Sequence, residues 1–261
     1  MNLDLMTIAV RRRTLAELYD LALLVLRRHL LPLATLAVLG ALPWVLLDAW
    51  LLSGMSEPAM AWYLLTILAV AQAPLATGAI TAYLGEAMFN PRPSVRLALS
   101  TAAKRWGFLV QIGLMYGVLA CLPVLLFLAP PHAVAVAVLE NQSGSAAWKR
   151  AHALRIAWAT AWPTHLMMAA GVVVATLVML VGTLNALAQV LTSAKAMPDW
   201  EDLLPRLDPG QSVLPIAAFF AALAYLSVVH FLAYLDLRTD REGWDIDLAL
   251  RRVADRLQEA P

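Results

Sequence analysis

Four stretches of this chain are long and apolar enough to cross a lipid bilayer as helices. The hydrocarbon core of a bilayer is about 30 Å thick, so a crossing helix needs about 20 mostly apolar residues. The stretches are residues 30–52, 59–84, 163–191 and 213–235. Backbone polar groups must be satisfied inside each segment in lipid, so the pattern predicts an all-α, polytopic helical membrane protein.

The composition excludes several classes of protein. Apolar residues make up 61% of the chain and charged residues 14%, whereas a soluble domain has about 45–50% and about 25%. A water-soluble enzyme or a disordered segment is therefore disfavoured. The net charge of +1 provides no basic field for nucleic acid, and Cys121 is the single cysteine, so no internal disulfide is expected. We expect one integral membrane domain over residues 1–261.

Residues 107–139 are apolar, but Pro130 and Pro131 interrupt them. Basic residues flank this region on both sides, and basic loops are usually cytoplasmic. The region is therefore expected to enter the membrane and return as a hairpin, which gives about six crossings. It makes either two short crossings that meet near Pro123 or Pro130, or one crossing followed by a broken return.

The distribution of Arg and Lys predicts that both termini are cytoplasmic. The segment 53–58 carries only Glu57 and is expected outside, and the acidic segment 192–212 is expected there too. No cleavable signal peptide is expected, because Tyr19, Asp20 and Arg27 interrupt the early apolar residues. Richness in Ala, Leu and Arg favours a bacterial protein, and we expect it in the inner membrane. The basic residues expected on the cytoplasmic side lie at positions 11–13, 27, 28, 92, 96, 104, 105, 149, 150, 155, 238, 241, 251, 252 and 256, and the other two, Lys195 and Arg206, lie in the segment 192–212.

Short amphipathic helices are predicted at residues 14–28, 94–106, 145–162 and 245–259, on the cytoplasmic side. The first three each precede a pair of apolar segments, which indicates either a repeated unit or a coincidence of Ala- and Leu-rich composition. Gly243 is expected to end the last span.

Two passages carry a resemblance to a known group. Residues 234–247 read YLDLRTDREGWDID, and residues 138–144 read VLENQSG, followed by the basic pair Lys149-Arg150. Together they resemble bacterial multi-pass proteins of the glycerophosphoryl diester phosphodiesterase membrane-domain-like, or YciC-like, group. Ala151 stands where that group usually has Ser. The resemblance implies a six-span membrane protein and no reaction, because the catalytic domain behind the group's name is not in this chain.

Polar residues inside the apolar segments are the candidates for a ligand or proton site. They are His165, His230, Gln111 and Asn185. An ionisable group within a membrane is a functional hypothesis by default, although both histidines could instead be neutral and hydrogen-bonded to a neighbouring helix. Asp48 is expected to be an interfacial carboxylate that reaches water, and Gln72 an amide that joins two helices.

A charged cluster at the end of the last span is the candidate for partner docking. Its members are Asp236, Arg238, Arg241, Glu242 and Asp245. The alternative is an ion-pair network that braces the bend after the span.

We therefore expect a non-enzymatic protein that scaffolds or anchors a membrane-associated complex, with the bilayer and a cytoplasmic or membrane protein as partners. The alternative is a small transporter or lipid-handling protein with a polar site between the spans. The sequence contains no motif for a metal, a cofactor or a catalytic constellation.

Overall fold

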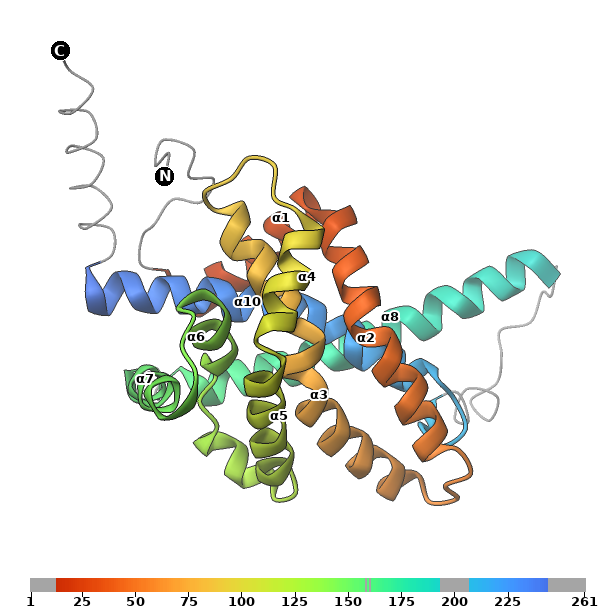
Figure 1. The fold of residues 1–261 in the computed structure, drawn as a ribbon. Coiled ribbons are helices and arrows are strands. Elements are labelled where there is room, and N and C mark those ends of the chain that lie inside the picture. Colours follow the sequence, from red (N-terminus) through yellow and green to blue (C-terminus); the bar gives the residue numbers. More distant parts are fainter. Residues whose placement is uncertain (1–12, 158, 160, 193–206, 244–261) are drawn as a thin grey trace, which may run out of the picture.

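The computed structural model describes residues 13–157, 159, 161–192 and 207–243, with the side chains of residues 157 and 185–192 excepted. Every regular element in this part of the chain is a helix, which confirms the all-α prediction (Figure 1). The elements are α1 (Leu15–Arg28), α2 (Leu30–Leu52), α3 (Pro58–Ala87), α4 (Val95–Lys104), α5 (Trp106–Ala120), the 3-10 helix η2 (Pro123–Leu128), α6 (Ala133–Leu139), α7 (Gly144–Ala157), α8 (Trp162–Thr192) and α10 (Leu214–Glu242).

Four of these helices, α2, α3, α8 and α10, are long and apolar enough to cross a membrane. They coincide with the four apolar stretches of the sequence. Helices α2 and α8 leave large apolar side chains such as Leu31 and Met167 exposed, as expected for helices that contact lipid. Helices α3 and α10 are mostly buried within the molecule.

The middle of the chain contains one apolar helix and an irregular return. Helix α5 has 15 residues, which corresponds to about 22 Å of rise. Pro123 then begins η2, which turns back toward the short helix α6. Of the two arrangements left open by the sequence, this resembles one helix followed by a broken return.

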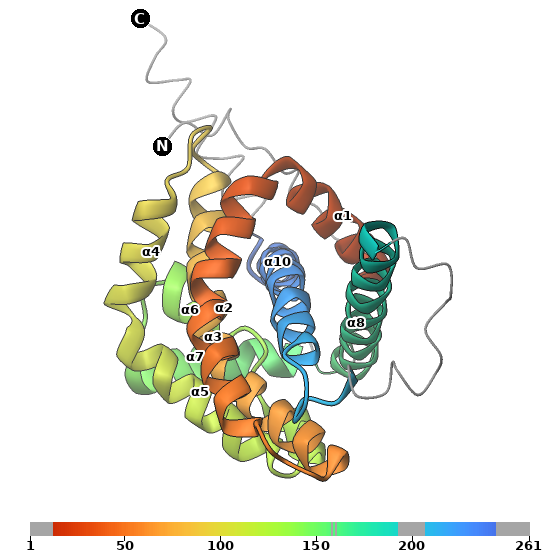
Figure 2. The ribbon, with the colours of Figure 1, turned by 90° about the vertical axis from the view of Figure 1, so that its right-hand side faces the viewer.

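Helix α10 lies at the centre of the molecule. It packs against α1, α2, α3 and α8, and Figure 2 shows it between α2 on one side and α8 on the other, with α1 across them. Its buried residues include Phe231 and Tyr234, which belong to the largest apolar cluster. This position brings side chains of α10 into contact with the N-terminal and middle parts of the chain.

Local signals in the sequence explain where two helices begin and end. Thr14 caps α1 with a full capping box. Its hydroxyl oxygen accepts from the backbone N of Glu17, and the Glu17 carboxylate accepts from the backbone N of Thr14. Helix α10 ends before Gly243, which adopts φ +58°, a left-handed conformation that favours glycine.

Two of the helices predicted as amphipathic, α1 and α7, pack on the bundle through buried apolar side chains. In α1, Leu18 and Ala22 are buried against the core, and α1 packs on α10. In α7, Ala147, Ala151 and Leu154 join the same cluster. These stripes are therefore occupied by protein rather than by headgroups, and α1 instead exposes Leu23 and Leu24. The helix predicted at residues 245–259 lies outside the described residues.

Candidate functional site

The two histidines predicted within spans lie against each other. His165 is on the first turn of α8 and His230 is in the middle of α10, and their Nε2 atoms are 2.7 Å apart. Helices α8 and α10 pack side by side, so residues 65 positions apart face one another. His165 is 1% exposed. A contact of this length between two ring nitrogens is a hydrogen bond, so one Nε2 carries a proton that the other accepts.

Tyr19 extends this contact to α1. Its hydroxyl lies 3.1 Å from Nδ1 of His165. Burial, and to a smaller extent the neighbouring Tyr225, raise the pKa of Tyr19 above its usual range, so the hydroxyl keeps its proton. When Tyr19 donates to Nδ1, His165 must carry its own proton on Nε2 and donate to His230. The three side chains then form a directed chain of hydrogen bonds from α1 to α10.

Aromatic rings enclose the pair. Trp162 stacks on His165 with ring centroids 5.5 Å apart and an interplanar angle of 16°, and Tyr225 of α10 meets Tyr19 edge-on. The Tyr225 hydroxyl donates to the backbone oxygen of Tyr19. These contacts fix α1, α8 and α10 around the histidines; they bury His165, whereas His230 is partly exposed.

A second polar group lies farther along α10. Tyr234 donates its hydroxyl to Oε1 of Glu140 at 2.7 Å, and Glu140 accepts from Arg150 at 3.1 Å. Arg150 also pairs with Glu242, and Glu242 pairs with Arg238 at 2.9 Å. Arg238 in turn lies over the Tyr234 ring, 5.9 Å from its centroid. We call these five residues the charged ring.

The charged ring joins the two passages that carry the resemblance described above. Glu140 and Arg150 come from the first passage, and the other members come from the second. Burial lowers the pKa of Arg150, but hydrogen bonds to Glu140 and Glu242 outweigh it and hold that pKa above its ordinary value. The guanidinium is therefore a permanent charge that holds two carboxylates together.

The other members of the predicted docking cluster have separate contacts. Asp236 accepts a hydrogen bond from the backbone N of Arg13 at 2.7 Å, and Arg241 is 3.9 Å from Asp240. Asp245 lies outside the described residues. The four described members of the cluster are thus engaged in contacts within the molecule, and of these Arg241 is 59% exposed.

The remaining predicted site residues do not join the histidine pair. Gln111 is exposed on α5, which packs chiefly on α3. Asn185 belongs to α8, but its side chain lies outside the described part. His132, at the start of α6, is buried, with its ring 6.2 Å from that of Tyr234. It is not among the site residues predicted from the sequence, because no motif surrounds it.

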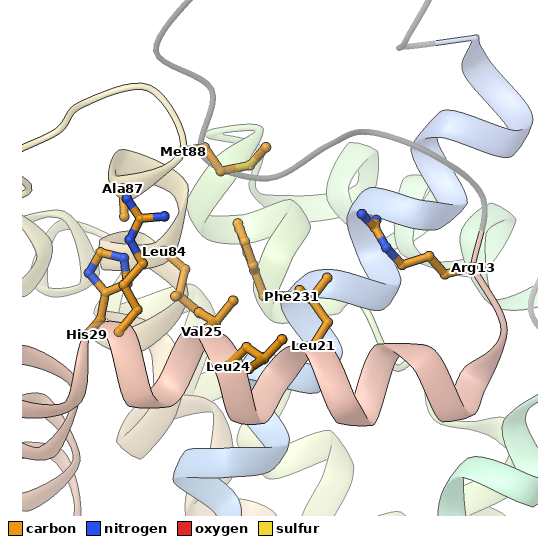
Figure 3. Close-up of a pocket in the computed structure, with 10 residues that line it drawn as sticks. Arg13, Leu21, Leu24, Val25, His29, Leu84, Ala87, Met88 and Phe231 are labelled. Atoms are coloured by element: carbon orange, nitrogen blue, oxygen red, sulfur yellow. The ribbon is translucent and has the colours of Figure 1, made fainter.

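A pocket of about 290 Å³ lies between α1, the end of α3 and α10. Figure 3 shows His29 and Arg13 at its two ends and Phe231 between them. Arg28 also lines it, and the other lining side chains are apolar. The pocket therefore combines basic side chains with an apolar wall.

Among the described residues, no group of three or more His, Cys, Asp or Glu side chains is placed to hold a metal ion. Neither a protein family model, nor a curated protein, nor a solved structure matches the chain. The assignment of a function therefore depends on the contacts given above.

Proposed function

We propose that the protein is a small transporter or lipid-handling protein of a bacterial inner membrane, with a proton-binding site between its spans. In this proposal both termini are in the cytoplasm. Residues 107–139 form a hairpin in the membrane, which gives six crossings. The distribution of Arg and Lys supports this topology. The group resembled by residues 138–151 and 234–247 has the same six-span layout.

The single observation that carries the proposal is the contact between His165 and His230. Histidine is the side chain whose charge most readily changes near neutral pH, and ionisable groups inside membranes commonly mark ion pathways or proton relays. Two histidines joined through Nε2 can share one added proton and pass it between α8 and α10. Tyr19 provides a third proton-carrying group on α1.

Proton movement through the full-length protein in sealed vesicles tests this function. Vesicles loaded with a pH-sensitive dye receive an inside-negative potassium diffusion potential through valinomycin. We expect vesicles with the protein to acidify faster than protein-free vesicles. His165→Gln and His230→Gln should each return the rate to the protein-free level, because the amide cannot accept and release a proton.

His152→Gln is the matched control, because His152 is exposed on α7, away from the spans. It should leave the rate unchanged. The proposal is wrong if wild-type vesicles acidify no faster than empty ones, or if the two span variants conduct protons as well as the wild type.

Scaffolding of a membrane complex is the second candidate. The observation that favours it is the presence of exposed apolar side chains, Leu97 on α4 and Ile156 on α7, on helices that we place at the cytoplasmic surface. Arg238 and Glu242 of the predicted docking cluster are paired within the charged ring, and Asp236 accepts from the backbone N of Arg13, so this candidate ranks second. Extraction in a mild detergent followed by affinity purification should recover a partner in fixed ratio, whereas the bare protein under several conditions would count against it.

A further inference from the structure

Asp48 of α2 and Gln72 of α3 form an isolated polar pair inside the apolar part of the molecule. Nε2 of Gln72 donates to Oδ1 of Asp48 at 2.7 Å. Asp48 is 0% exposed and Gln72 is 6% exposed. Asp48 therefore does not reach water, which corrects the expectation of an interfacial carboxylate. The reason is that its side chain points to the middle of α3 rather than to the outer end of the span.

The surroundings of this pair are apolar. Leu52 lies one turn from Asp48, and Ala69 and Ala76 lie one turn from Gln72 on either side. All three belong to a buried cluster that α10 completes with Ile216 and Phe220. This environment offers an ionised carboxylate little solvation.

Within the described helices α2, α3 and α10, no second charge lies near Asp48 to compensate its ionised form. Helix α2 has no other ionisable residue, and α3 has only Tyr63, Tyr83 and Glu86, each more than two turns from Gln72. In α10 the first ionisable residue is Tyr225, which comes after Ile216 and Phe220, the two α10 residues of the buried cluster. Among the described residues, the buried atoms Oδ2 of Asp48 and Oε1 of Gln72 have no hydrogen-bond partner.

A single proton would satisfy both unpaired oxygens. A carboxylic acid and a carboxamide can form a closed pair, in which the amide N–H donates to one carboxyl oxygen and the acid O–H donates to the amide oxygen. The first of these bonds is present. The unpaired atoms, Oδ2 of Asp48 and Oε1 of Gln72, are both acceptors. A proton on Oδ2 would supply the donor of the second bond.

We propose that Asp48 and Gln72 form a proton-binding site, in which Asp48 is the neutral acid and its Oδ2–H donates to Oε1 of Gln72. Formation of the acid takes up one proton that comes from solvent water, and ionisation returns that proton to solvent. The proposal is independent of the histidine pair, because the site lies between α2 and α3 and shares no contact with His165 or His230.

Asp208 provides a comparison within the same chain. It is also buried, at 5% exposure, but both of its carboxyl oxygens accept hydrogen bonds. Oδ1 accepts from the backbone N of Gly210 at 2.9 Å, and Oδ2 accepts from Nε2 of Gln211 at 3.0 Å. Both carboxyl oxygens of Asp208 therefore already have hydrogen-bond donors, unlike Oδ2 of Asp48.

Infrared spectroscopy of the full-length protein in lipid vesicles tests the site, because the C=O band of a carboxylic acid is separate from carboxylate bands. At neutral pH we expect the wild type to show an acid band that shifts in D₂O. Asp48→Asn should remove this band, and Gln72→Leu should move it to higher frequency by removing the hydrogen bond. Asp208→Asn, the matched control, should leave it unchanged.

A second measurement identifies the acid band even if Asp48→Asn misfolds. Labelling all aspartates with carboxyl-¹³C should shift the acid band of the wild type. In Asp48→Glu with the same label, the acid is an unlabelled glutamate, so its band should not shift. The proposal is overturned if the wild type has no acid band at neutral pH, or if Asp48→Asn removes a carboxylate band. A carboxylate band that changes when sodium replaces potassium would also overturn it, since it would indicate a bound cation.

Discussion

At the level of single residues, the charged ring shows how two distant passages of the chain depend on each other. Arg150 contacts both Glu140 and Glu242, and Tyr234 closes the ring through its hydroxyl. Removal of one partner from such a group leaves the others desolvated without compensation. The ring is therefore a brace between α7 and the end of α10.

Arg150→Met tests this brace. Because Arg150 is 27% exposed, water screens part of the effect, and we expect a loss of about 1–2 kcal/mol in the free energy of unfolding. Melting in detergent micelles measures it. Lys149→Met is the control, since Lys149 is the exposed neighbour; equal melting temperatures for the two variants would contradict a bracing role.

The histidine pair shows that the spacing of residues along a sequence does not determine which side chains of different helices make contact. His165 and His230 were selectable because each interrupts an apolar stretch. Their contact, and the participation of Tyr19, depend on which faces of α1, α8 and α10 meet. Tyr19 is buried on the face of α1 that packs on the bundle, and no pattern in the sequence indicates the partner of its hydroxyl on α8.

At the level of elements, small residues let α3 approach its neighbours. A Cβ placed on Gly113 of α5 would lie 2.2 Å from the backbone oxygen of Ala71, and one on Gly40 of α2 would lie 2.3 Å from that of Ala76. Helix packing in membranes depends on such close approach, because apolar side chains gain little by leaving lipid.

Gly113→Ala should therefore separate α5 from α3. The backbone oxygen cannot move without its helix, so overpacking of about 1–3 kcal/mol should exceed the gain in helix propensity of about 1 kcal/mol. The variant should melt at a lower temperature in detergent. Gly171→Ala on α8, where an added Cβ meets nothing within 4 Å, should melt at or above the wild-type temperature. A stabilised Gly113→Ala would show that this helix contact is not tight.

The order of the described elements can be compared with the repeated unit that the sequence left open. Helix α1 precedes α2 and α3, α4 precedes α5, η2 and α6, and α7 precedes α8 and α10. The middle unit is reduced, since α6 has only 7 residues. The first and last units supply the four helices that are long enough to cross a membrane.

At the level of the whole molecule, the topology depends on the hairpin of residues 107–139. In the proposed six-crossing arrangement, α5 starts at the cytoplasmic side and its far end faces outward. Cys121, the single cysteine of the chain, caps that end and is exposed. It is therefore a natural probe of the position of the turn.

A membrane-impermeant maleimide added to intact spheroplasts should label Cys121. Ser94→Cys in a Cys121→Ala background marks the segment before α4, which we place in the cytoplasm, and it should react only after the membrane is disrupted. Labelling of Cys121 that also requires disruption would place the turn inside the membrane or on the cytoplasmic side, and six crossings would then be wrong.

The sequence by itself determined the helical class, the four long apolar helices and several helix ends, because these follow from local composition, spacing and capping residues. It also marked His165 and His230, since polar groups in apolar segments are visible without a fold. Only the tertiary structure decided which faces meet: it paired the two histidines, closed the charged ring and turned Asp48 toward Gln72. Apolar helices in lipid have many faces of similar hydrophobicity, so their contacts depend on shape and hydrogen bonding between distant residues, which no local pattern encodes.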